Sequence, residues 1–245
     1  MPIKPILFSA PMVTALLEGR KTQTRRILNR LKGYPGLSDF MRSETKGFDW
    51  EFRRKDKVWC SFRHEDLLKI MPHVGGDLLY VRENFSRPVI NEFIKYNIPP
   101  QHWENVALSE YGIHYWADGN PEFGDWENPK PSIHMPRKHS RLTLEVTNVR
   151  VELLQDISEE DAKAEGIGEY PCLGPHRGPK ATFFSANGRE TDLGAALTPR
   201  LAFLNLWDSL NKDLGFGWDA NPWVSVTEFK VHKCNIDEFE KEAVQ

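Results

Sequence analysis

A lysine and two threonines lie within four residues of one another near the start of the chain. Residues 20–26 read Arg-Lys-Thr-Gln-Thr-Arg-Arg. A threonine hydroxyl is a weak nucleophile near neutral pH and needs a base within hydrogen-bond reach. Lys21 can be that base if burial or the neighbouring arginines lower its pKa toward neutrality. The segment therefore holds the parts of a lysine-activated hydroxyl nucleophile.

The same segment also has a purely structural interpretation. A run rich in Lys, Thr and Arg after a helix is typical of an edge strand with a solvated face, and charges on an edge strand prevent aggregation. In an ideal strand, residues three apart point to opposite faces. Lys21 and Thr24 therefore meet only if the chain turns or bulges between them. Taken alone, the segment leaves both interpretations open.

Three helices are expected around this segment. The apolar run at residues 12–17 predicts one side of a helix, and Gly19 stands where a glycine in the left-handed conformation often ends one. A serine N-cap predicts a second helix over residues 158–165. A third is predicted over residues 199–210, opened by a proline. Its three-residue spacing predicts a core stripe of Leu201, Leu204, Trp207 and Leu210.

Strands are expected where apolar and polar residues alternate. This pattern occurs at residues 78–82, 142–151 and 223–231, and the last run begins after a proline. Polar stretches without periodicity separate the elements, which is typical of functional or partly disordered loops. We therefore expect an α+β fold with long loop insertions at about residues 31–58, 88–130 and 171–198.

Charge is distributed unevenly along the 245 residues. The formal net charge of -3 argues against a protein that coats nucleic acid by bulk electrostatics. Residues 20–32 nevertheless carry six cations and no acid, whereas residues 237–242 are mostly acidic. A local basic site is therefore compatible with the composition.

The composition predicts a cytoplasmic protein with no bound cofactor. No run of about 18 apolar residues could span a membrane, and the N-terminal residues lack the pattern of a secretory signal. Three scattered cysteines form no disulfide framework. A zinc site built from Cys60, His64, Cys172 and His176 is a weak alternative, because structural zinc sites more often use closer Cys pairs. No metal is predicted.

Several separated motifs together resemble the ASCH domain. They are the Gly-Arg-Lys-Thr-x-Thr-x-Arg run at residues 19–26, the Gly-Asp-x-Leu-x-Val-Arg-Glu run at 76–83, and the segment at 154–160 that follows a long strand. Residues 132–137 and 221–224 look like a longer form often carried by phages. The resemblance covers residues 4–230 outside the insertions. It implies a single domain over residues 1–245 with the PUA-like fold, a small pseudo-β-barrel associated with RNA and modified nucleosides.

One branch of that family, the bacterial acetylcytidine amidohydrolases, uses a lysine, a threonine and a glutamate. The resemblance implies Lys21 as the proton acceptor and Thr24 as the nucleophile. The proton-donating glutamate falls in the helix after the second long strand, which implies Glu165, although Glu159 and Glu160 are close by.

Other charged residues are candidates for substrate or phosphate binding. They are Arg20, Thr22, Arg25, Arg26, Arg82, His134 and Arg137. Glu83 is expected to be a structural partner of Arg26 or Arg82 rather than a catalyst. Six aromatic residues in one insertion could stack on bases, but a private core of that loop is favoured. They are Trp103, Tyr111, Tyr115, Trp116, Phe123 and Trp126.

Two classes of function follow from these observations. The first is an amidohydrolase that removes an acyl group from a modified base or nucleoside. The alternative is a module that binds RNA or DNA without catalysis through Arg20, Lys21, Arg25 and Arg26, or a nuclease that uses the same basic cleft. The hydrolase needs the Thr24 hydroxyl, whereas the binding module needs only the cations and loses affinity steeply with salt.

Overall fold

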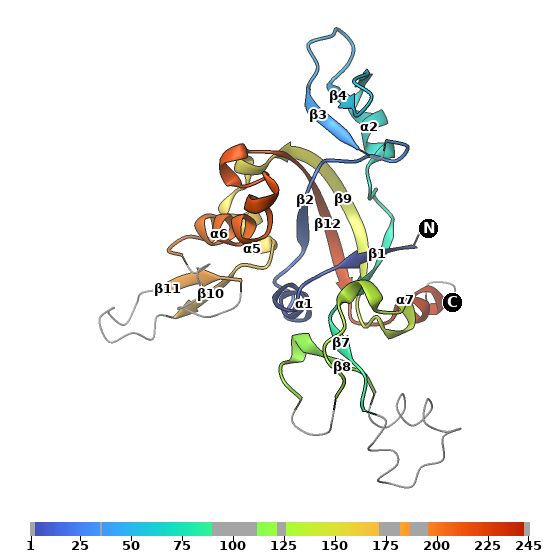
Figure 1. The fold of residues 1–245 in the computed structure, drawn as a ribbon, viewed down its shortest axis with the longest axis vertical. Coiled ribbons are helices and arrows are strands. Elements are labelled where there is room, and N and C mark those ends of the chain that lie inside the picture. Colours follow the sequence, from blue (N-terminus) through green and yellow to red (C-terminus); the bar gives the residue numbers. More distant parts are fainter. Residues whose placement is uncertain are drawn as a thin grey trace. The chain divides into compact units, whose positions relative to one another are not determined.

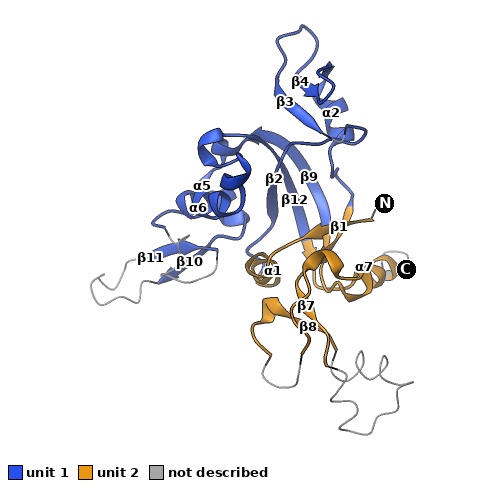
Figure 2. Ribbon diagram, in the orientation of Figure 1, with its two compact units in different colours: residues 1, 19–77, 145–230 blue, residues 2–18, 78–144, 231–245 orange. Residues whose placement is uncertain are grey.

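The chain forms two compact units, each of which is described here by itself (Figure 2). The computed structural model describes residues 3–34, 36–89, 112–121, 126–171, 182–186 and 196–242. Unit 1 holds residues 19–77 and 145–230. Unit 2 holds residues 2–18, 78–144 and 231–245.

Three neighbouring strands form the sheet of unit 1. They are β2 (Gln23–Ile27), β9 (Thr143–Leu153) and β12 (Trp223–His232), in the order β9-β12-β2 (Figure 1). β2 is antiparallel to β12, and Thr24 lies opposite Thr227. The two long strands confirm the alternation found in the sequence, and β2 lies at the end of this strand order, as an edge strand would.

Two helices lie side by side next to this sheet (Figure 1). α5 (Glu159–Ala164) begins at Ser158, whose Oγ accepts a hydrogen bond from the Asp161 N–H at 3.0 Å. α6 (Pro199–Asn211) begins at Thr198, whose hydroxyl accepts from Leu201 N–H at 3.3 Å. Both N-caps satisfy backbone donors that a helix start leaves open. The predicted serine cap is thereby confirmed.

Smaller elements complete this side of unit 1. β10 (Gly168–Pro171) and β11 (Thr182–Ser185) pair as an antiparallel ladder. Three short 3-10 helices are η5 (Leu154–Asp156), η6 (Lys212–Leu214) and η7 (Trp218–Ala220).

The core between the helices and the sheet of unit 1 contains only part of the apolar stripe that was predicted for α6. Phe203 and Trp207 are buried against Val224 and Val226 of β12, together with Ala162 of α5. Leu201 and Leu210 were expected in this core, but they are 48% and 54% exposed. A spacing of three residues drifts around a helix that turns every 3.6 residues, so the ends of the predicted stripe leave the buried face.

A small sheet occupies the region predicted as the first insertion. β3 (Leu37–Arg42), β4 (Trp50–Arg54) and β5 (Trp59–Phe62) form an antiparallel sheet, followed by α2 (His64–Ile70). Trp50 and Phe52 are fully buried. The expectation of a loop without regular structure is therefore wrong for this stretch, because a few large aromatic residues form its core where polar residues dominate the sequence.

Unit 2 contains the beginning of the chain. β1 (Ile3–Leu7) pairs in parallel with β6 (Leu78–Arg82), which neighbours the first residues of β9. α1 (Ala10–Leu17) follows β1 and confirms the predicted helix, which ends before Gly19 at a φ of 77°. The remaining elements are β7 (Phe85–Ser86), β8 (His114–Tyr115), η2 (Trp116–Asp118), η3 (Ser132–His134), η4 (Arg137–His139) and α7 (Ile236–Glu242).

The architecture is a mixed α+β fold, as predicted. Within the described residues, the strands belong to open ladders and none of the sheets closes into a barrel. The PUA-like identity of the fold stays a prediction. No described helix combines the length and apolar character that a membrane crossing requires.

Truncating the buried face of α6 should destabilise the protein much more than truncating its exposed face. Trp207→Ala removes a 5% exposed indole, and we expect a loss of about 3–5 kcal/mol in the free energy of unfolding. Leu201→Ala should cost less than about 0.5 kcal/mol. Urea denaturation of both variants measures this, and equal losses would contradict the assignment of the buried face.

Candidate functional site

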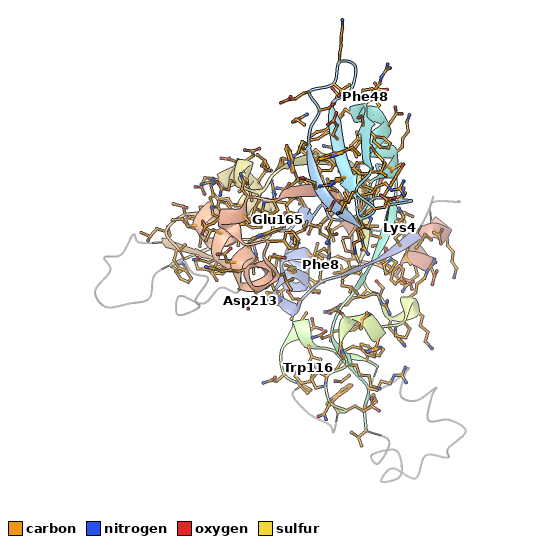
Figure 3. All side chains as sticks on the ribbon, turned by 45° about the horizontal axis from the view of Figure 1, so that its top comes forward. Lys4, Phe8, Phe48, Trp116, Glu165 and Asp213 are labelled. Atoms are coloured by element: carbon orange, nitrogen blue, oxygen red, sulfur yellow. The ribbon has the colours of Figure 1, made fainter. Side chains whose placement is uncertain are left out.

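Lys21 is fully buried, which is unusual for a lysine. Its Nζ donates to the carboxylate Oε2 of Glu165 at 2.9 Å and to the Glu165 backbone carbonyl at 2.7 Å. Glu165 is itself only 5% exposed and follows α5 (Figure 3). The structure therefore brings together two of the three residues implied by the family resemblance.

Backbone hydrogen bonds hold this pair in register. Lys21 and Glu165 form an isolated antiparallel bridge. Next to it, the Thr22 N–H donates to the Ala164 carbonyl at 2.8 Å, and the Thr22 carbonyl accepts from the Phe229 N–H at 2.9 Å. The chain before β2 is thus attached to the end of α5 on one side and to β12 on the other.

Arg25 is the second buried cation of the site, and its side chain is completely inaccessible. One guanidinium nitrogen, Nη1, donates to Glu165 Oε1 at 3.2 Å. The opposite edge donates to Glu152 Oε1, from Nε at 3.1 Å, and to Asp161 Oδ2, from Nη2 at 3.0 Å. Lys21 and Arg25 therefore each engage a different oxygen of the Glu165 carboxylate.

Arg150 extends the cluster along β9. Its guanidinium binds Glu152 Oε2 at 2.9 Å, both carboxylate oxygens of Asp161 at 3.1–3.2 Å, and Glu228 of β12. The charge cluster thus contains three cations and four carboxylates, a formal balance of 3 − 4 = −1, and it runs from the buried Lys21, Arg25 and Glu165 to partly exposed members. Its members are Lys21, Arg25, Arg150, Glu152, Asp161, Glu165 and Glu228.

Burial shifts the protonation of the cluster in defined directions. Loss of water on burial lowers the pKa of Lys21 from its ordinary 10.5. The attraction and hydrogen bond of Glu165 act to raise this pKa, whereas the charges of Arg26 and Arg25 lower it further. Burial acts to raise the pKa of Asp161, but its hydrogen bond from Gln23 and the charges of Arg25 and Arg150 lower it overall. The neutral amine form of Lys21 is therefore more accessible than in water.

The two threonines of the motif lie in different surroundings. Thr24 is 4% exposed within β2, and strand alternation places it on the face opposite Gln23 and Arg25. Thr22 is exposed and lines two cavities, of 350 and 260 Å³. The structure thus leaves the role of Thr24 as a prediction and places the Thr22 hydroxyl where a small molecule could reach it.

The other predicted binding residues divide between the two units. In unit 1, Arg20 donates to the Gly166 carbonyl and lines the larger cavity, and Arg26 is exposed. In unit 2, Arg82 donates to the Met135 carbonyl at 2.7 Å, and Arg137 binds Asp237 and Glu240 of α7. His134 is an exposed residue of η3 in that unit.

Glu83 has a structural role, but with a different partner from the one expected. Its two carboxylate oxygens accept hydrogen bonds from Nε and Nη2 of Arg141, both at 2.9 Å. Arg141 also binds Asp118 and lies 4.1 Å from the centre of the Tyr115 ring. The prediction of Arg26 or Arg82 is wrong, because Arg141 supplies a guanidinium fork that matches the carboxylate.

Aromatic residues of the second insertion pack on one another where the structure describes them. The His114 ring lies 5.2 Å from Trp116 and 5.3 Å from Trp126, and the Trp116 indole donates to Ser86 Oγ. These rings are half-buried, and the private core stays a prediction. Trp103, Tyr111 and Phe123 lie outside the described residues.

Two of the four residues of the zinc alternative, Cys60 and His64, lie within the described structure. The Nδ1 atom of His64 accepts a hydrogen bond from the Trp50 indole at 3.0 Å. Cys172 and His176 lie outside the described residues, so the four-residue set is not tested.

Sequence reasoning missed two carboxylates of the cluster, Glu152, which binds Arg25, and Glu228, which binds Arg150. Both occupy strands, where acidic residues are expected to face solvent. The available signal was local only for Glu152, which lies two residues after Arg150 on β9 and therefore on the same face of that strand.

Removing Arg25 should leave the cluster with two cations, Lys21 and Arg150, against four carboxylates. We expect Arg25→Met to lose about 3–5 kcal/mol of unfolding free energy near neutral pH, whereas Arg30→Met, at an exposed position, should change it by less than about 0.5 kcal/mol. The loss for Arg25→Met should shrink toward pH 4, because protonation removes the uncompensated charge. Chemical denaturation between pH 4 and 8 measures both variants, and a pH-independent loss would contradict this account.

In comparisons with protein-family models, with curated proteins and with solved structures, nothing matches this chain.

Proposed function

We propose that this protein is an amidohydrolase that removes an acyl group from the base of a modified nucleoside. One observation carries the proposal, the fully buried Lys21 ammonium on the Glu165 carboxylate at 2.9 Å. A buried lysine whose pKa is lowered is a frequent general base, because its neutral amine becomes accessible near neutral pH.

The Lys21–Glu165 pair holds one transferable proton. In the ammonium–carboxylate form, Glu165 accepts a proton and Lys21 donates one; in the amine–acid form, the roles are exchanged. Burial reduces the energetic difference between the two forms, because it penalises the charged one. The pair can therefore take a proton from an attacking hydroxyl and return one to a departing amine.

Amide hydrolysis then proceeds in two balanced stages. In the scheme that the resemblance implies, the Thr24 hydroxyl turns toward the pair from the other face of β2, and its oxygen attacks the acyl carbon while its proton passes to the pair. The C–N bond then breaks as the amine leaves with a proton from the pair. Water next attacks the resulting ester, which releases the carboxylic acid and restores the Thr24 hydroxyl. The assignment of Thr24 rests on the resemblance of the Lys-x-x-Thr motif to the acetylcytidine amidohydrolases.

The same resemblance supports a PUA-like identity for the α+β fold. We also place the protein in the cytoplasm, since its three cysteines are scattered and reducing compartments favour free thiols. Both statements are part of the proposal.

The binding-module alternative receives less support from the site. Two of its four proposed phosphate ligands, Lys21 and Arg25, are inaccessible and bound to carboxylates. A phosphate would have to displace those carboxylates, which would leave them buried without a partner. The same argument applies to a nuclease that uses these cations.

Four substitutions test the hydrolase directly with N4-acetylcytidine as the substrate. Lys21→Met and Glu165→Gln should each lower kcat by about 10²–10⁴-fold, because each removes proton transfer. Thr24→Val should lower kcat at least as much. Release of acetate measured by steady-state kinetics checks these expectations.

Two further threonines supply matched controls. Thr227→Val changes the cross-strand neighbour of Thr24, which is 2% exposed, and should retain kcat within a few fold. Thr22→Val should mainly raise KM. Loss of activity in Thr22→Val with normal activity in Thr24→Val would reassign the nucleophile, and absence of turnover by the wild type on acylated nucleosides would refute the hydrolase.

The pH dependence of kcat/KM should report Lys21. We expect kcat/KM to fall with rising pH along a limb centred below 10.5, because the pair loses its one transferable proton there and the Lys21 pKa is lowered. The charged groups that act on Lys21 are Glu165, Arg25 and Arg26. Arg26→Met removes a cation that lowers this pKa, so the limb should move to higher pH. An unmoved limb would argue against Lys21 as the titrating group.

A further inference from the structure

Two cavities meet at the same short stretch of backbone. Thr22 and Ala164, which are joined by the 2.8 Å hydrogen bond between Thr22 N–H and the Ala164 carbonyl, line both of them. Lys21 precedes Thr22 in the chain and Glu165 follows Ala164, and Lys21 and Glu165 form an isolated antiparallel bridge. Any small molecule that reaches the proposed catalytic pair along this edge meets the walls of these cavities.

The smaller cavity contains acidic side chains whose charge is already compensated. Asp161 and Glu228 line this space of 260 Å³. Both bind Arg150, and Asp161 also binds Arg25. This cavity therefore presents oxygens that are engaged with arginines, and it offers little net charge to a ligand.

The larger cavity has the opposite character. Arg20 and Lys163 line its 350 Å³ together with one acid, Glu169. Within the described part of the chain, Lys163 has no carboxylate partner, and its ammonium lies 5.7 Å from the centre of the Phe184 ring. The Arg20 guanidinium donates to the Gly166 carbonyl. Two cationic side chains thus line this cavity, and no carboxylate of the described residues pairs with Lys163.

The floor and size of this cavity also restrict the ligand. Ile167, a buried residue of the core beneath α5, provides an apolar surface beside Ala164. A volume of 350 Å³ lies at the lower end of the range of about 300–1,000 Å³ for small-molecule sites. That volume has room for one nucleotide.

We propose that this cavity binds the phosphate of a mononucleotide, with Lys163 and Arg20 as its cationic ligands and Thr22 between the phosphate and the catalytic pair. The inference rests on the proposed function, because it makes an acylated nucleoside monophosphate, rather than the free nucleoside, the preferred substrate. Charge-assisted hydrogen bonds of a guanidinium and an ammonium to phosphate supply the preference.

Binding measured without turnover tests this inference separately from the hydrolase. Titration calorimetry compares cytidine 5′-monophosphate with cytidine on the full chain. We expect the nucleotide to bind at least about tenfold more tightly, as one or two charge-assisted hydrogen bonds provide. Equal affinities, or no binding of either compound, would overturn the proposal.

Charge substitutions at the cavity give effects of opposite sign. Lys163→Gln should reduce the preference for the nucleotide to near one, whereas Glu169→Gln should increase it by removing a repelling carboxylate. Lys212→Gln is the matched control, since Lys212 is an exposed lysine of unit 1 that does not line the cavity. Lys163 is itself exposed, so its substitution should not impair folding. A preference that is unchanged in Lys163→Gln would refute the site.

The two hypotheses fail in distinguishable ways. Hydrolysis of acetylcytidine with no preference for its 5′-phosphate would keep the hydrolase and reject the nucleotide site. Tight, Lys163-dependent binding of cytidine 5′-monophosphate without hydrolysis would keep the site and reject the hydrolase. Binding of a cytidine oligonucleotide but not of the mononucleotide would overturn the proposal in favour of a polymer ligand.

Discussion

The contact on which unit 1 most depends is the pairing of two buried cations with one carboxylate, Lys21 and Arg25 with Glu165. It ties the edge strand β2 to the end of α5, and it forces further carboxylates to gather around Arg25. Buried ions of this kind are stable only when each has a partner of opposite charge. The cluster therefore fixes the register of β2 against α5 more strictly than apolar packing alone would.

Much of the fold followed from the sequence where a pattern was long or a cap was present. Ser158 caps α5 as predicted, and the alternation at 223–231 became β12. The sheet of β3, β4 and β5 was missed because charged residues flank Trp50 and Phe52 on both sides, so the apolar alternation there is short. Exposed Leu201 shows a second limit, because spacing indicates a helical face but not how wide the partner surface is.

The candidate site was predictable only where a local motif marked the residue. Lys21 and Glu165 came from motif positions, and the structure joins them. The role of Arg25 changed completely, from a phosphate ligand to the centre of a buried cluster, because its partners lie more than one hundred residues away in the chain. Local sequence shows that a cation is present, whereas only the tertiary fold shows whether a carboxylate reaches it.

Neither compact unit is a continuous segment of the chain. The backbone passes between them after residues 18, 77, 144 and 230, so each unit needs pieces made at different times during synthesis. The strand β12 pairs with β2 across about two hundred residues, and Arg137 meets its carboxylates on α7 only after residue 240 has been made. The contacts that β12 and α7 make with earlier segments therefore form late in synthesis, and pairings between such distant segments slow folding.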